Sequence, residues 1–221
     1  MRWPRRLFRN RREAGERLVP ALRALGLDRP LVFALLRGGV AVAAPIAQAL
    51  RAPLLPFIVR KLGVPWQPEL AFGALAEGAA EPVLNADIVA ACGLSPADIA
   101  AVRAREEAEL HRRQAVYLAG RARPDPRGRA AILVDDGLAT GASARAALRA
   151  LRAEGAAPLI LAIPVAPAES IAAIEGECDR VICAEISDIP AGIGGCYEDF
   201  HQLEDEEVLV LLRGAAGEER P

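Results

Sequence analysis

Apolar runs of strand length alternate with helical segments along most of this chain, and this alternation constrains the fold more than any other feature. Strands that alternate with helices form a parallel sheet covered by helices on both faces. The sequence therefore predicts an α/β fold with a five-stranded, mostly parallel sheet. The strand patterns occupy 31–36, 53–61, 131–136, 157–165 and 179–186, and the helical patterns occupy 11–26, 40–50, 95–120, 142–155 and 167–177.

A length of 221 residues predicts a single domain, 1–221. Three parts of it lie outside the strand–helix pattern. Residues 1–10 form a basic arm, 61–84 are rich in Pro and Gly and predict a flexible loop or a small hairpin, and 214–221 form a frayed tail.

Composition excludes several functional classes. The longest apolar run, 158–168, falls short of the ~20 residues of a membrane span, and no apolar stretch follows the charged N-terminus, so we expect a cytoplasmic protein. A net charge of -2 disfavours nucleic acid as a partner, and the arginines of the basic arm are interpreted as a solvated tail that leads into a helix, rather than as an RNA-binding or membrane-binding arm. The four cysteines show neither the spacing of zinc ligands nor a C-x-x-C pair, so we expect reduced thiols rather than a zinc site or a disulfide framework.

Two turns after predicted strands contain unusual residues. The first is "RGG", Arg37, Gly38 and Gly39; the second is "DDGLATGAS", residues 135–143. Ligands of parallel sheets bind just beyond the carboxyl ends of the strands, where both turns belong. In the second turn, Ala139, Gly141 and Ala142 expose backbone N–H groups at a helix start, and Thr140 and Ser143 add hydroxyl donors. Such a turn favours a phosphate, whereas carboxylates favour sugar hydroxyls or a hydrated Mg²⁺.

The second turn preceded by its strand, "ILVDDGLATGAS", resembles the phosphoribosyl-pyrophosphate (PRPP) signature of type I phosphoribosyltransferases. Further segments, among them "FRNRREAG", "LLRGGVAVAAPIAQAL", "IVRKLGVPWQPELAFGAL" and "YEDFHQLEDEEV", extend the resemblance to a bacterial branch of that family over residues 8–213. This branch usually has Asp where the chain has Asn10 and Pro where it has Leu36.

The resemblance implies roles for the residues of both turns. Asp135 and Asp136 would hold the ribose hydroxyls and, directly or through water, Mg²⁺. Residues 139–143 would bind the 5-phosphate, and Gly137 would be a further PRPP-binding residue. Arg37, Gly38 and Gly39 would bind the diphosphate, with a non-proline cis peptide at Leu36–Arg37 as the family suggests. Lys61 would act as a catalytic residue beside Arg37, Asp135 and Asp136, from a flexible flap that begins at Arg60 and Lys61.

The reaction implied is displacement of pyrophosphate from PRPP by a ring nitrogen of a small, nucleobase-like acceptor, in a homodimeric enzyme. A hood over 185–203 would hold the acceptor, with Tyr197 or Phe200 as a stacking face, although a core role for either ring is an equal alternative. Ala139 disfavours a 6-oxopurine acceptor, because the family's 6-oxopurine enzymes have an aspartate there. Two alternatives stay open, a PRPP-binding regulatory protein without catalysis and a hydrolase that uses water as the acceptor.

Overall fold

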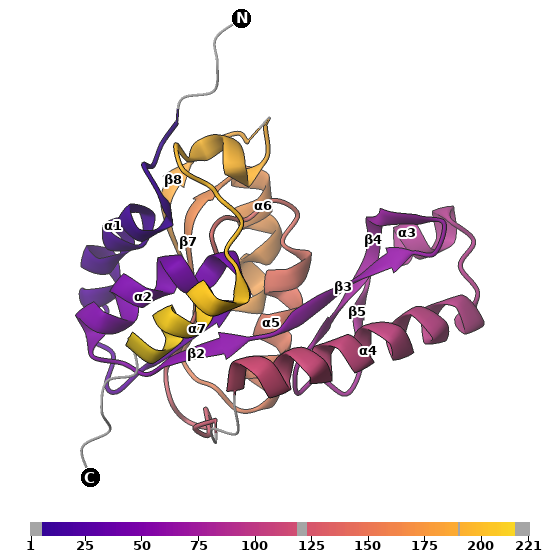
Figure 1. Cartoon of the computed structure of the whole chain (residues 1–221), viewed down its shortest axis with the longest axis horizontal. Coiled ribbons are helices and arrows are strands. Elements are labelled where there is room, and N and C mark those ends of the chain that lie inside the picture. The colour runs from indigo at the N-terminus through magenta and orange to yellow at the C-terminus, as the bar shows by residue number, and fades with distance from the viewer. Residues whose placement is uncertain (1–5, 119–122, 190, 215–221) are drawn as a thin grey trace, which may run out of the picture.

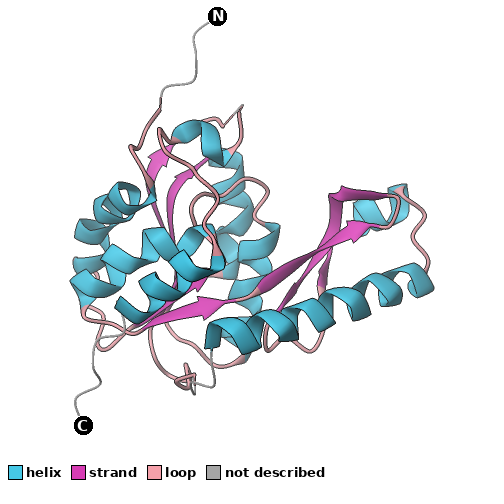
Figure 2. Ribbon diagram, in the orientation of Figure 1, coloured by secondary structure: helices cyan, strands magenta, loops and turns pink. Residues whose placement is uncertain are grey.

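A computed structural model describes residues 6–118, 123–189 and 191–214. Its main sheet has five strands, all neighbours are parallel, and helices cover both faces (Figures 1 and 2). The predicted fold class is confirmed. In spatial order the strands are β2 (Leu54–Phe57), β1 (Leu31–Leu35), β6 (Ala131–Val134), β7 (Leu159–Ala166) and β8 (Arg180–Ile186).

The core divides into two layers because successive strand residues point to opposite faces of the sheet. Phe33, Leu133 and Leu161 pack on one face, and their sequence neighbours Ile132 and Ile160 pack on the other. The first face is covered by α5 (Ala142–Ala153) and α6 (Ala168–Ile174), which is followed by the short 3₁₀ helix η1 (Glu175–Glu177). The second is covered by α1 (Arg11–Arg23), α2 (Gly38–Leu50) and α7 (Asp205–Gly214).

A second, antiparallel sheet extends beside β2 together with two helices; we call residues 59–118 the lobe (Figure 1). Leu62 and Phe72 of this sheet are fully buried against Val102 and Leu110 of the long helix. The lobe therefore has an apolar core of its own. Its elements are β3 (Val59–Val64), β4 (Gln67–Ala76), β5 (Val83–Leu84), α3 (Ala86–Ala91) and α4 (Pro96–Leu118).

Within 61–84, the hairpin alternative is the one that the structure contains. Pro65 and Trp66 form a two-residue turn between β3 and β4, and the register shifts at Gly63. A Cβ atom on Gly63 would lie 2.3 Å from the backbone oxygen of Pro68, so glycine is required where the two strands approach each other. The Pro and Gly content of this segment does not prevent apolar burial, because Leu62 and Phe72 are buried under α4. Its mobility stays a prediction.

The predicted strand 53–61 is also corrected. It divides at Ile58 into β2, which belongs to the main sheet, and β3, which begins the lobe.

The basic arm is corrected within its described part. Leu7 and Phe8 donate backbone hydrogen bonds to the carbonyl of Cys196 at 2.8 and 3.0 Å, and Phe8 is 1% exposed. The chain is therefore part of the fold from Leu7 onward rather than a solvated tail. Residues 1–5 and 215–221, which include most of the predicted frayed tail, lie outside the described residues.

Candidate active site

The two unusual turns lie side by side because β1 and β6 are adjacent parallel strands, with Ala34 paired to Val134. Glycine makes their contact possible. A Cβ atom on Gly38 would lie 1.9 Å from Oδ2 of Asp136, and one on Gly39 would lie 2.6 Å from the carbonyl oxygen of Val134. The peptide Leu36–Arg37 is cis, as expected. The structure thus brings the predicted residues of both turns together at one edge of the sheet.

Asp135 and Asp136 form a half-buried carboxylate pair at this edge. The backbone N–H of Asp136 donates to Oδ1 of Asp135 at 2.8 Å, and Nε of Arg11 donates to Oδ2 of Asp136 at 2.9 Å. Burial raises the pKa of Asp135 well above its ordinary value, and the charge of Asp136 raises it further. Burial also raises the pKa of Asp136, opposed by Arg11. The surroundings therefore stabilise the ionised form of the pair poorly, and a bound cation or hydroxyl donors would supply the missing stabilisation.

The rest of the second turn ends at the start of α5. Gly137 is buried under Ile193, and Gly141 occupies the N-cap position of α5 with a φ of 73°, in the left-handed region. The side-chain hydroxyl of Ser170 donates to the carbonyl of Ala139, which fixes the loop from outside. Ala139 and Thr140 are exposed. The first amides of a helix lack intrahelical acceptors, so this turn presents N–H groups beside the carboxylate pair.

Arg37 lies at the N-cap of α2, next to the N-terminus of α7. Its Nη1 atom is 3.7 Å from Oδ1 of Asp205, and the hydroxyl of Tyr117 donates to the same oxygen. The Arg37 side chain is 24% exposed. The guanidinium is therefore accessible to a ligand while a loose ion pair holds it at the edge of the sheet.

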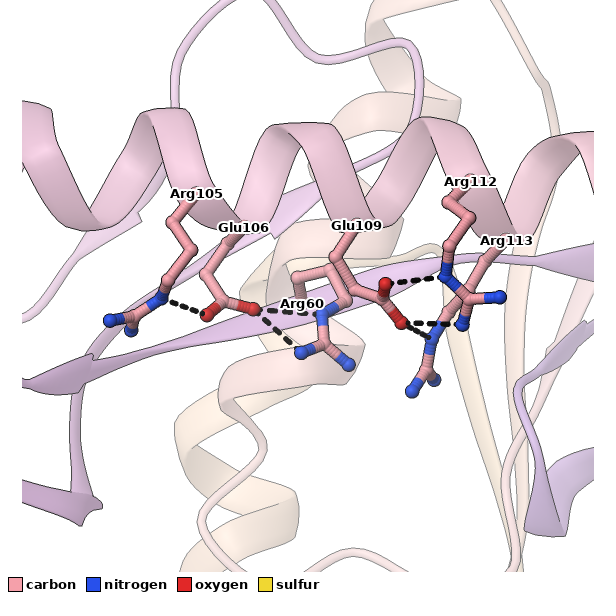
Figure 3. A network of polar contacts seen from close by, with 6 residues as sticks. All are labelled: Arg60, Arg105, Glu106, Glu109, Arg112 and Arg113. Atoms are coloured by element: carbon pink, nitrogen blue, oxygen red, sulfur yellow. Dashed lines mark hydrogen bonds and ion pairs between the residues drawn. The ribbon is translucent and has the colours of Figure 1, made fainter.

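Arg60 and Lys61 point to opposite faces of β3, as neighbouring strand residues do. Figure 3 shows Arg60 directed toward α4, where its Nε and Nη2 donate to Oε2 of Glu106 at 2.9 and 2.6 Å. Lys61 is exposed on the other face, and its charge lowers the pKa of Asp135. Arg60 therefore anchors β3 to α4, whereas Lys61 lies on the opposite, exposed face of β3.

The predicted hood, 185–203, overlaps the end of β8 and continues through the short 3₁₀ helix η2 (Ile193–Cys196). Tyr197 is 3% exposed and packs against the rings of Phe8 and Phe200, with centroids 5.3 and 5.0 Å away. Its hydroxyl donates to the backbone oxygen of Asp136 at 2.6 Å. Tyr197 thus has the alternative core role and offers no free stacking face, which corrects the expectation for this ring.

Phe200 is half-buried, and the guanidinium carbon of Arg11 lies 3.7 Å from its ring centroid. One face of this ring is therefore already covered by Arg11, and that face cannot stack on an acceptor.

Sequence reasoning missed Arg11, which is 8% exposed and bonded to Asp136. An arginine in the first turn of a helix is ordinarily solvated. The one sequence signal for this residue was that it lies within "FRNRREAG", a segment that resembles the family. The adjacent Asn10, where the related branch has Asp, caps α1 by accepting the N–H of Glu13 at 2.9 Å. Asp and Asn both cap helices well, so this departure retains the local structure.

Within the described residues, no group of three or more His, Cys, Asp or Glu side chains could hold a metal ion by itself. A cation at Asp135 and Asp136 would therefore take its other ligands from water or substrate oxygens. None of the described helices is long and apolar enough to cross a membrane.

Comparison with known proteins agrees with this geometry. The model of the phosphoribosyl transferase domain family matches residues 10–201. Two curated proteins of Mycobacterium tuberculosis, "Putative phosphoribosyl transferase MT0597" of strain CDC 1551 / Oshkosh and "Putative phosphoribosyl transferase Rv0571c" of strain H37Rv, are 42% identical over 207 residues. The match covers 94% of this chain and 46% of each relative, so the chain spans about half their length.

Among solved structures, that of TT1426 from Thermus thermophilus superposes with a TM-score of 0.79 at 38% identity. The match covers 95% of this chain and 99% of that one. The sheet-edge site, the family model and these relatives lead to one conclusion: the chain belongs to the phosphoribosyltransferase family.

Proposed function

We propose that the chain transfers the 5-phosphoribosyl group of PRPP to a ring nitrogen of a small acceptor, with release of pyrophosphate. The observation that carries the proposal is the joining of two turns at one sheet edge. A carboxylate pair and a helix N-terminus, Asp135 to Ser143, lie directly beside the glycine turn with its arginine, Arg37 to Gly39. The 5-phosphate, the ribose hydroxyls and the diphosphate of PRPP thus each have a complementary group within one site.

Each group has a role that its chemistry supports. The carboxylates of Asp135 and Asp136 accept hydrogen bonds from the vicinal ribose hydroxyls. The amides and hydroxyls of residues 139–143 at the start of α5 bind the 5-phosphate. Arg37 and the backbone of Gly38 and Gly39 bind the diphosphate, which leaves with the electron pair of the broken C–O bond while the acceptor nitrogen forms the new bond to the same carbon.

The donor set at Asp135 and Asp136 suits Mg²⁺. Both side chains supply hard oxygen ligands, and within the described residues only the guanidinium of Arg11 pairs with them, through Asp136, so two ionised carboxylates would share one paired cation. When bound, Mg²⁺ would neutralise charge that accumulates on the leaving diphosphate. The two carboxylates would hold it directly or through water.

Lys61 is proposed to act on the same charge from the lobe. It is exposed on the face of β3 that is turned away from α4, and its positive charge opposes the rise in the pKa of Asp135 that burial and Asp136 cause. A preorganised cation directed at developing charge contributes about 3 kcal/mol to catalysis. Closure of the predicted flap, which begins at Arg60 and Lys61, would exclude water, which competes with the acceptor as the nucleophile.

The acceptor is proposed to be nucleobase-like, with 6-oxopurines disfavoured by Ala139. The test is incubation of PRPP and Mg²⁺ with adenine, orotate, hypoxanthine or no acceptor, scored for pyrophosphate release. Release that requires adenine or orotate supports the proposal. Release without any acceptor indicates a hydrolase, and PRPP binding without release indicates a regulatory protein.

A further inference from the structure

Arg11 connects three segments that are far apart in the sequence. Its Nε donates to Oδ2 of Asp136 at 2.9 Å, its Nη1 donates to the backbone oxygen of His201 at 2.9 Å, and its guanidinium covers the ring of Phe200. The side chain is 9% exposed. The planar guanidinium therefore joins the start of α1, the carboxylate pair and the C-terminal part of the hood.

These contacts restrict how the Asp136 carboxylate can be oriented. Oδ2 faces Arg11 on one side and Gly38 on another, where a Cβ atom would lie 1.9 Å away. The hydroxyl of Tyr197 holds the backbone oxygen of the same residue at 2.6 Å. Backbone and side chain of Asp136 are thus both fixed, and Oδ2 is engaged within the protein.

We infer that Arg11 is a positioning residue for PRPP binding: by holding Oδ2 of Asp136, it directs Oδ1 toward the ribose hydroxyls. This inference rests on the proposed function, because it gives Asp136 a ribose-binding role. Arg11 has no contact with the ligand in this account, so its whole effect passes through Asp136. Two changes that act through one interaction are not additive, which makes the inference testable by a double-mutant cycle.

The experiment measures PRPP affinity by calorimetry, with Mg²⁺ present, for Arg11→Met, Asp136→Asn and the double variant. Arg12→Met is the matched control, because its side chain is 71% exposed and pairs only along α1 with Glu16. We expect Arg11→Met to weaken PRPP binding on the order of tenfold, as loss of a charge-assisted hydrogen bond does, with Arg12→Met within about twofold of the original protein. In the Asp136→Asn background, Arg11→Met should add less than about a twofold loss.

Arg11→Lys keeps the protein assessable if the methionine variant folds poorly. Lysine retains the charge but lacks the planar fork that reaches Asp136 and His201 together, so its PRPP affinity should fall between those of the original protein and Arg11→Met. A full additional loss in the Asp136→Asn background, or PRPP binding unchanged in both Arg11 variants, would overturn the inference. If Asp136→Asn alone leaves PRPP binding intact, the ribose-binding role fails, and the inference fails with it.

Discussion

Gly38→Ala tests whether the contact between the two turns is essential to the site. The new Cβ atom would lie 1.9 Å from Oδ2 and 2.7 Å from Cγ of Asp136, where real Cβ contacts are rarely below 3.0 Å. The carboxylate would have to move by about 1 Å. It cannot do so freely, because Arg11 holds Oδ2 at 2.9 Å.

The expected cost has two parts. Overpacking of this kind lowers the free energy of unfolding by about 1–3 kcal/mol. A displacement of ~1 Å in a substrate-positioning group lowers kcat/KM on the order of a hundredfold. Urea denaturation measures the first effect, and steady-state kinetics of pyrophosphate release measures the second.

Two further glycines supply controls for Gly38→Ala. Gly176 is exposed in η1 with open space around its Cβ position, so Gly176→Ala should leave kinetics unchanged and stability unchanged or slightly higher. Gly39→Ala would place its Cβ 2.6 Å from the backbone oxygen of Val134 in the central sheet, so its loss of stability should exceed that of Gly38→Ala. The reasoning is refuted if Gly38→Ala keeps kcat/KM within about twofold of the original protein.

Three other variants test separate parts of the structure. Burial, opposed by Arg123, raises the pKa of Glu77 to about 7, so the free energy of unfolding should fall as the pH rises from about 4.5 through 7. In Glu77→Gln, the fall in the free energy of unfolding over this pH range should be smaller than in the original protein by up to about 3 kcal/mol, as measured by urea denaturation. The same pH dependence in both proteins would contradict the raised pKa of Glu77. Lys61→Met should lower kcat more than PRPP affinity, as measured by kinetics and calorimetry; unchanged turnover would rule out its role in the flap. Arg60→Met should remove the partly buried pair with Glu106 and increase hydrogen exchange in β3, whereas Arg105→Met, at a 64% exposed side chain, should not; equal exchange in the two variants would contradict the anchoring role.

The main sheet was predictable because its strands contain nearly continuous apolar runs, most of which end at a recognisable turn; the exception is β2, whose apolar pattern continues into β3. Leu31–Leu35 and Leu159–Ala166 are buried at every position, as strands covered on both faces must be. The same runs located the two turns, because the site of a parallel sheet follows the carboxyl ends of its strands.

The strand pairing within the lobe and the role of Arg11 were beyond sequence reasoning for different physical reasons. In β3 and β4 the register shifts around Gly63 and Pro68, so the apolar residues lose the period of two that marks a strand. Arg11 is buried only because Asp136 and the backbone of His201, more than a hundred residues away, supply its acceptors. The residue pattern of one helix does not indicate partners that come from such distant segments.

Calorimetric titration of the original protein and of Asp135→Asn with PRPP and Mg²⁺ tests the central claim most directly. Asparagine keeps the shape of the side chain and removes its charge, and burial already disfavours the charged form of Asp135. The account therefore predicts a thermal midpoint that is unchanged or higher, together with a loss of PRPP affinity of at least about tenfold. Equal affinity in the two proteins, or an original protein that does not bind PRPP, would contradict it.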